Sequence, residues 1–194
     1  MIFWEKMYII VEKYIGKFYA LPLNSVLGIM VFLLMIWIVF GVAFRNRRKM
    51  YKGWKIFNIM LCIFSLLLII KMTLWGRSVR NKELELYPFY TLTTISYNME
   101  AIRTLLMNII LFFPFGLTVP YVVETIPIKR NKCRCILCIL SGFIISVTIE
   151  SLQYYFGIGR AETDDVICNT LGCALGVLAY VVQWKWRKVK SSER

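Results

Sequence analysis

The sequence predicts an all-α integral membrane protein, a bundle of about five transmembrane helices with an N-terminal amphipathic helix. Composition is the first reason: 59% of the 194 residues are hydrophobic and 18% are charged, whereas soluble domains are about half apolar and about a quarter charged. Patterning is the second reason, because the charges gather in short clusters between long apolar runs. A chain that crosses a bilayer repeatedly has this arrangement.

Five apolar stretches are each long enough to cross the hydrocarbon core, which takes about 20 helical residues at about 1.5 Å per residue. We expect two of them within residues 26–75 and three within residues 84–184, followed by a basic tail at residues 185–194. The five expected spans are Val26–Phe44, Ile56–Trp75, Leu105–Val123, Ile136–Phe156 and Val166–Trp184.

Residues 1–25 precede the first span and have a different pattern. Their apolar positions recur at steps of three and four residues, as in Phe3, Met7, Ile10 and Tyr14. That spacing predicts an amphipathic helix lying at the membrane surface. Charged residues interrupt the segment, so we expect no cleaved signal peptide.

The distribution of Lys and Arg predicts the orientation. With the N-terminus outside, the cytoplasmic segments would hold 15 of the 24 basic residues and the outer segments 8. Cytoplasmic loops retain Lys and Arg. We therefore expect a multi-pass protein of the cell membrane with its N-terminus outside and its C-terminus in the cytoplasm.

The net charge of +13 could suggest a nucleic-acid partner. Basic residues that flank membrane spans explain this charge, and no separate folded module is left to carry a basic face. The expected partner is therefore the lipid bilayer and not nucleic acid.

The six cysteines do not predict a metal centre. Three lie within apolar runs, where a thiol behaves as a small hydrophobe. Cys133, Cys135 and Cys138 crowd the start of one span, but their spacing is not a paired C-x2-C set and the chain has no His. We expect neither a metal nor a cofactor.

Histidine-based catalysis is excluded because the chain contains no His. No recognisable catalytic motif is present, so the sequence favours a protein that is not an enzyme. Acid–base chemistry by carboxylates, namely Glu150, Asp164 or Asp165, stays open.

Polar residues within the spans are the candidate functional residues, because the bilayer makes them costly. In the predicted topology they all lie near the outer ends of their spans. Glu150, alone in hydrocarbon, would cost several kcal/mol. We therefore expect it to pair with Arg160, ten residues further on, with amide side chains completing the network. The candidates are Asn108, Glu150, Gln153, Arg160, Asp165 and Asn169.

Two interpretations of this cluster stay open. Amides and carboxylates between spans can simply hold helices together. The same residues could instead form a ligand or substrate site near the outer surface. Gly172 and Gly176, four residues apart, give the last span a small-residue face for close helix packing.

Four blocks of sequence in the same region resemble the VanZ-like family of small bacterial membrane proteins. They are LELYPFYT at Leu84–Thr91, NIILFFPFG at Asn108–Gly116, ESLQ at Glu150–Gln153 and RAETDDVICNTLGCALG at Arg160–Gly176. The last block is the most specific. The resemblance implies a role at the cell envelope, in some members lowered susceptibility to teicoplanin. It also implies the same six candidate residues.

Three functions follow as hypotheses. The first is an envelope protein that lowers the access of a glycopeptide to its lipid-linked target. The second is a membrane enzyme that modifies a lipid-linked cell-wall precursor. The third is a structural partner of another membrane protein, bound through the face of Gly172 and Gly176 and the basic cytoplasmic loops.

Overall fold

The computed structural model describes residues 34–41, 48–75, 82–90, 99–128 and 131–192. Residues 34–41 are helical. The chain divides after Phe40 into two units, and the second unit holds every element named below. The expected N-terminal amphipathic helix and most of the expected span Val26–Phe44 lie outside the described residues.

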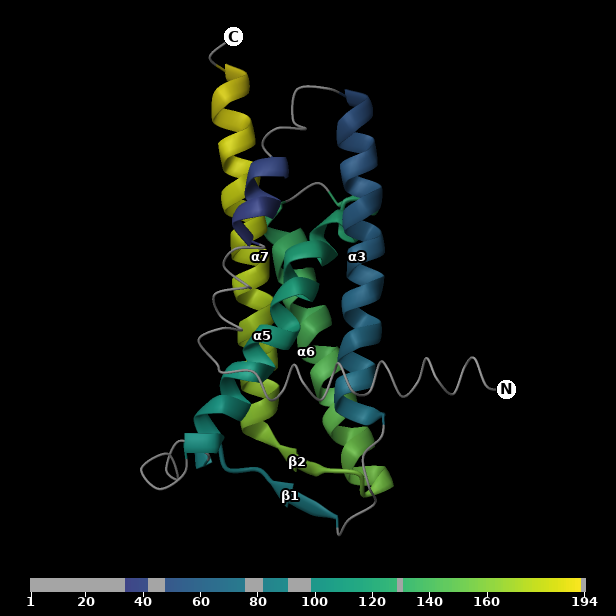
Figure 1. Ribbon diagram of the computed structural model, residues 1–194, viewed down its shortest axis with the longest axis vertical. Coiled ribbons are helices and arrows are strands. Elements are labelled where there is room, and N and C mark those ends of the chain that lie inside the picture. Colours follow the sequence, from purple (N-terminus) through teal and green to yellow (C-terminus); the bar gives the residue numbers. More distant parts are fainter. Residues whose placement is uncertain (1–33, 42–47, 76–81, 91–98, 129–130, 193–194) are drawn as a thin grey trace, which may run out of the picture. The chain divides into compact units, whose positions relative to one another are not determined.

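Four long helices run alternately up and down the second unit (Figure 1). They are α3 (Arg48–Leu74), α5 (Met99–Val123), α6 (Asn131–Phe156) and α7 (Thr163–Ser192). Each contains a segment long and apolar enough to cross a membrane, namely Tyr51–Leu74, Ile102–Val123, Asn131–Phe156 and Thr163–Lys185. The predicted all-α membrane bundle is confirmed. The helices begin three to eight residues before the predicted spans, because polar first turns can continue the helix at the membrane surface.

Helix α5 is the central helix of the unit. It packs most extensively on α7 and also contacts α3 and α6. Phe112 and Tyr121 on α5 are completely buried. More than half of the apolar segment of α5 is buried, 56%, against 28% for α3. The outer helices therefore have broad apolar faces available to lipid.

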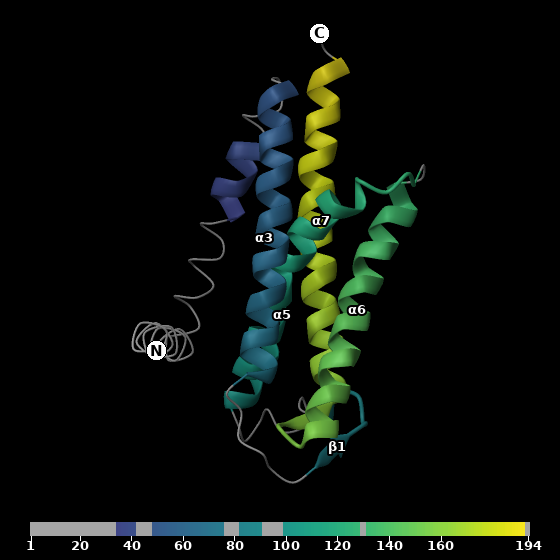
Figure 2. The same ribbon diagram turned by 90° about the vertical axis from the view of Figure 1, so that its right-hand side faces the viewer.

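Helix α3 shows such a face most clearly. Its side chains Phe57, Met60, Phe64 and Leu67 are all more than half exposed, and the helix stands apart from α6 along much of its length in Figure 2. Large apolar groups are stable in such positions when hydrocarbon replaces water around them. This surface is consistent with contact with the lipid bilayer.

Close approach of α5 and α7 depends on glycine. A Cβ atom added to Gly172 would lie 2.2 Å from the carbonyl oxygen of Ile109, and one added to Gly176 would lie 2.3 Å from that of Phe113. Both obstacles belong to the α5 backbone. The small-residue face of α7 is therefore filled by α5 within the same chain. The hypothesis that the protein is a structural partner of another membrane protein stays a prediction, and in this arrangement the glycine face itself is occupied by α5.

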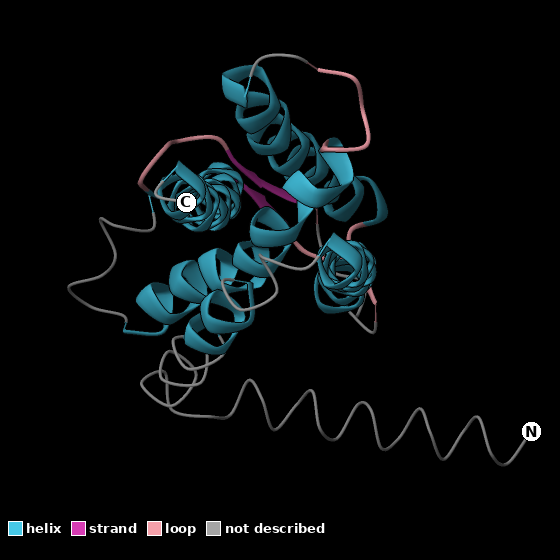
Figure 3. Cartoon of the chain, turned by 90° about the horizontal axis from the view of Figure 1, so that it is seen from above, coloured by secondary structure: helices cyan, strands magenta, loops and turns pink. Residues whose placement is uncertain are grey.

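Two short strands cross the end of the bundle where α3, α6 and the start of α7 meet (Figures 1 and 3). Strand β1 (Glu83–Glu85) pairs in parallel with β2 (Arg160–Glu162), with Leu84 opposite Ala161. We call this pair the ribbon. No strand is predicted here from the sequence. Three-residue strands are too short for hydrophobic alternation to identify.

The turn between α6 and β2 directs the chain from the end of α6 into the ribbon. Gly157 has a φ of 61°, a left-handed conformation that costs little only for glycine. Its N–H donates to Tyr154 O at 3.2 Å, and the N–H of Ile158 donates to Gln153 O at 3.0 Å. This pair of bonds forms a Schellman motif, which ends α6 and turns the chain across the bundle end.

The opposite end of the bundle has its own polar network. The Glu124 carboxylate accepts hydrogen bonds from Tyr51, at 3.1 Å, and from Tyr180, and lies 3.7 Å from the Lys55 ammonium. Tyr121 accepts a bond from the Trp54 indole at 3.1 Å and donates to Gln183 at 3.0 Å. These contacts join α3, α5 and α7 at the end of the unit opposite the candidate residues.

Candidate functional site

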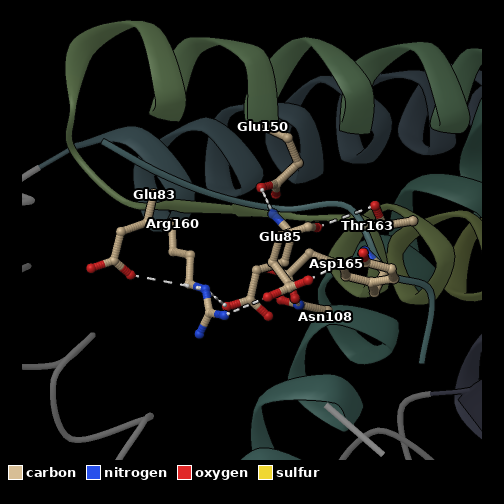
Figure 4. Close-up of polar contacts among 9 residues, drawn as sticks. Glu83, Glu85, Asn108, Glu150, Arg160, Thr163 and Asp165 are labelled. Atoms are coloured by element: carbon tan, nitrogen blue, oxygen red, sulfur yellow. Dashed lines mark hydrogen bonds and ion pairs between the residues drawn. The ribbon is translucent and has the colours of Figure 1, made fainter. Parts of the chain in front are cut away.

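The structure places all six predicted candidates at the ribbon end of the bundle. Asn108 comes from α5, Glu150 and Gln153 from α6, and Arg160 from β2. Asp165 and Asn169 occupy the first two turns of α7. Four of them, Asn108, Glu150, Arg160 and Asp165, lie close to the ribbon in Figure 4.

Three amide side chains each join two helices. Asn108 Nδ2 donates to Asp165 Oδ1 at 2.7 Å, between α5 and α7. Asn169 Nδ2 donates to Ser146 Oγ at 2.9 Å, between α7 and α6. Gln153 Nε2 donates to the Thr73 carbonyl at 3.1 Å, between α6 and α3. Such bonds hold helices in register within a bilayer, where water offers no alternative partner.

Two of these amides have a side-chain oxygen that accepts no hydrogen bond from the described residues. Gln153 and Asn169 are each 2% exposed, and their side-chain oxygens Oε1 and Oδ1 have no hydrogen-bond partner among the described residues. A buried acceptor without a partner costs about 1–3 kcal/mol. The polar interior at this end is therefore not fully satisfied by the chain alone.

Arg160 is surrounded by carboxylates (Figure 4). Its guanidinium lies 3.1 Å from Glu85, 3.5 Å from Glu162 and 3.9 Å from Glu83, and also faces the ring of Tyr90. Partial burial works to lower the pKa of Arg160, but the carboxylates outweigh it and raise that pKa above its ordinary value. The positive charge of Arg160 is thus balanced by carboxylates of the ribbon itself.

Glu150 has a different partner from the one expected. Its Oε2 accepts a hydrogen bond from the backbone N–H of Glu162 at 3.1 Å, and the residue is 7% exposed. A pair between Glu150 and Arg160 is not among the ion pairs of the described residues. The parallel pairing of β1 with β2 brings Glu83 and Glu85 beside Arg160, which explains the difference.

An open groove of about 350 Å³ lies between the ribbon and α6. Leu84 and Leu86 of the β1 segment form one wall, and Glu150, Ser151, Tyr154 and Tyr155 of α6 form the other. Ala161 and Val166 complete an apolar lining. This groove could not be predicted from local sequence patterns, because its walls lie more than 60 residues apart in the chain.

Acidic residues outnumber basic ones in the segments that form and adjoin the ribbon, although the chain as a whole is basic. Residues 82–90 and 150–165 contain six carboxylates and two cations, Lys82 and Arg160. The carboxylates are spread over the ribbon and the helix ends. Within the part of the chain that the structure describes, no three Cys, Asp or Glu side chains converge in a way that could hold a metal ion.

Comparison with known proteins identifies the family. Residues 29–184, most of the chain, match the family model described as VanZ/LLP1. The chain belongs to the VanZ/LLP1 family. A relative, "Protein VanZ" from Enterococcus faecium, is 33% identical over 92 residues, which make up 47% of this chain and 53% of that protein. The match thus spans about half the length of that relative. No solved structure matches the chain.

The VanZ/LLP1 match extends beyond the four blocks recognised in the sequence. It begins at residue 29 and so includes most of the first expected span and all of the second. The most specific block, Arg160–Gly176, forms β2 and the first half of α7. Its polar residues point to the ribbon end, and its two glycines pack on α5.

Sequence reasoning named Asp164 only as a possible acid–base group and left Glu85 out of the candidate site. Asp164 is 5% exposed, and its Oδ1 accepts the backbone N–H of Phe89, which has a φ of 63°. Glu85 holds Arg160 and also accepts the Thr163 hydroxyl through its carbonyl, at 3.3 Å. The alternation of Glu and Leu over residues 83–86 was the available signal, because it places the two residue types on opposite faces of an extended segment.

Proposed function

We propose that this VanZ/LLP1 protein acts at the outer face of the bacterial cell membrane, where it lowers susceptibility to teicoplanin-type glycopeptides. The observation that supports the proposal is the convergence of polar residues from three helices and the ribbon at one end of the bundle. Incompletely satisfied amides and an open groove at that end favour a ligand-facing role over helix packing alone. The family resemblance supplies the class of antibiotic.

The expected result concerns drug susceptibility in a sensitive Gram-positive host. Expression of the wild type should raise the inhibitory concentration of teicoplanin at least about tenfold relative to Glu150→Ala, because removing that carboxylate takes away a charge-assisted bond to the ribbon and a polar group of the groove wall. Vancomycin is measured in parallel. Protein levels in the membrane are matched by immunoblot.

The control variant is Lys132→Ala, which removes an exposed charge at the other end of α6. It should behave as the wild type does. Equal protection by the wild type and Glu150→Ala would show that the polar cluster serves only to hold the helices together. No protection by the wild type at a verified membrane level would contradict the proposed function. A changed precursor profile that depends on Glu150 would favour the membrane-enzyme alternative.

The proposal also requires the ribbon end to face outward. Cys133 is exposed in the first turn of α6, at the other end of the bundle from the ribbon. A membrane-impermeant maleimide should label Lys82→Cys in intact cells and Cys133 only after permeabilisation. Cys133→Ser identifies the label on the native thiol. Labelling in the reverse order would contradict the outward orientation, which rests on the distribution of Lys and Arg.

A further inference from the structure

The ribbon lies at the level where the membrane-spanning helices end. A hydrocarbon core takes about 20 helical residues. Counted from Arg134, near the start of α6, that length reaches Tyr154, close to the end of the helix. Counted back from Lys185 on α7, it reaches Asp165, in the first turn of that helix. Only residues 157–162 join the two helices. Strand β2 therefore stays at this boundary, and β1 stays there because it pairs with β2 (Figure 1).

Strand β1 and the residue that follows it have one charged face and one apolar face. The carboxylates of Glu83 and Glu85 lie 3.9 Å and 3.1 Å from the Arg160 guanidinium. Leu84 and Leu86 instead line the groove beside α6. Successive side chains of an extended segment point to opposite sides, so the segment is amphipathic. The same division into two faces holds amphipathic helices at a membrane surface.

Large apolar side chains are exposed along residues 82–90. Leu84, Leu86, Tyr87 and Phe89 are each more than half exposed. Side chains of this kind rarely gather on a surface that only water covers. Tyrosine rings in particular prefer the layer between hydrocarbon and water. The composition of this segment therefore fits the interfacial layer of a bilayer better than open water.

The lipid-facing surface of α6 leads to this segment. Val147 and Tyr155 are exposed on α6 and also line the groove. Lys82 Nζ lies 5.8 Å from the centre of the Tyr155 ring, and Lys71 Nζ lies 5.4 Å from that of Trp75 at the end of α3. Lysine and aromatic side chains together at helix ends mark the level of the head groups. The surface that hydrocarbon covers on α6 thus continues into the groove and reaches the ribbon.

We propose that residues 82–90 lie in the interfacial layer of the bilayer, with Leu84 and Leu86 toward the acyl chains and Glu83 toward water. The partner of this surface is the surrounding membrane phospholipid. The groove between the ribbon and α6 is then entered from the lipid phase and not from water. This inference goes beyond the proposed function, because it holds whichever side of the membrane the ribbon faces. Its test needs no antibiotic.

The first measurement uses the native full-length protein in phosphatidylcholine nanodiscs. Two phosphatidylcholine probes are photolysed in separate samples, one with a diazirine beside the acyl carbonyl and one with a diazirine at the methyl end of the chain. Attachment sites are mapped by mass spectrometry. The carbonyl probe should label residues 82–90, together with Trp75. The methyl-end probe should label the middle of α3 around Met60 and Phe64 and leave residues 82–90 unlabelled.

The second measurement compares the two faces of the segment. Leu86→Cys and Glu83→Cys are matched, because both side chains are more than half exposed in the protein itself. A neutral polyethylene glycol maleimide, which stays in water, should react at least about tenfold faster with Glu83→Cys, since apolar surroundings disfavour the reactive thiolate. Rates in nanodiscs are divided by those of the same variants unfolded in dodecyl sulfate. Mass spectrometry of the peptide that holds residues 82–90 separates these thiols from the native cysteines.

Each other outcome overturns the proposal. Equal rates at the two introduced thiols would place the leucine face in water. Labelling of Trp75 but not of residues 82–90 by the carbonyl probe would lift the segment off the membrane. Equal labelling of residues 82–90 and Met60 by the methyl-end probe would bury the segment in hydrocarbon. A slow Leu86→Cys thiol without lipid labelling would assign the face to a second copy of the chain. If either variant fails to fold, labelling of the native chain decides alone.

Discussion

Replacing Gly176 with alanine is expected to destabilise the protein, whereas the same replacement at Gly53 is expected to stabilise it slightly. The new Cβ at Gly176 would lie 2.3 Å from Phe113 O and 2.5 Å from Leu117 N. Both atoms belong to the α5 backbone, so no side-chain rotation can relieve the contact. Helices α5 and α7 would have to separate along their main interface. Overpacking of this kind costs about 1–3 kcal/mol.

Gly53 provides the matched comparison within the same bundle. It lies in α3, and nothing approaches within 4 Å of a Cβ atom placed there. Alanine at an open helical position is more favourable than glycine by about 1 kcal/mol. The two variants therefore differ in the sign of the effect although the chemical change is identical.

The measurement is the apparent melting temperature of each purified variant in detergent micelles, together with its recovery as a monodisperse species. Gly176→Leu should fail to accumulate in folded form, while Gly53→Leu should accumulate as the wild type does. A shift of the same sign and size at both glycines would contradict the close α5–α7 interface. Gly116→Ala is a second check, because its Cβ would lie 2.1 Å from the carbonyl oxygen of Cys173 on α7.

Asp164→Ala is expected to release the segment that follows β1 from the end of the bundle. The buried Asp164 carboxylate accepts the backbone N–H of Phe89, a bond between residues 75 positions apart. Phe89 has a positive φ of 63°, which costs of order 1–3 kcal/mol in a non-glycine residue and persists only where the surroundings enforce it. Loss of a bond to a charged acceptor costs about 1.5–3 kcal/mol more.

Hydrogen exchange measured by mass spectrometry tests this directly. In Asp164→Ala, residues 82–90 should exchange faster than in the wild type, while the middle of α5 keeps its protection. Asp164→Asn retains an acceptor oxygen and should show a smaller change. Phe89→Gly removes the conformational cost and should weaken the effect of Asp164→Ala. Unchanged exchange at residues 82–90 would contradict the role given to Asp164.

The sequence predicts the membrane bundle well because hydropathy is a local property. Runs of about 20 apolar residues must become spans, and their ends are recognisable from charge. The shared location of Glu150, Asn108 and Asn169 also follows from local information. Alternating spans place these three residues at one end of the bundle whatever their tertiary contacts are.

Contacts between distant segments could not be predicted in the same way. Arg160 was expected to pair with Glu150, ten residues away in sequence, but the ribbon gives it Glu85, which is 75 residues away. Nothing in the local pattern specifies a parallel register between two three-residue strands. Likewise, the small-residue face of Gly172 and Gly176 indicates close packing without saying which helix fills it.

The ribbon has a consequence for biogenesis. Strand β1 leaves the ribosome before α5, and β2 leaves it only after α6, so two complete hairpin-forming spans separate the partners. Their pairing must wait until α6 has been inserted and the chain has turned at Gly157. The carboxylates of Glu83 and Glu85 then meet Arg160 for the first time. The ribbon thus forms late in assembly, and only in chains whose preceding spans have been inserted in the correct order.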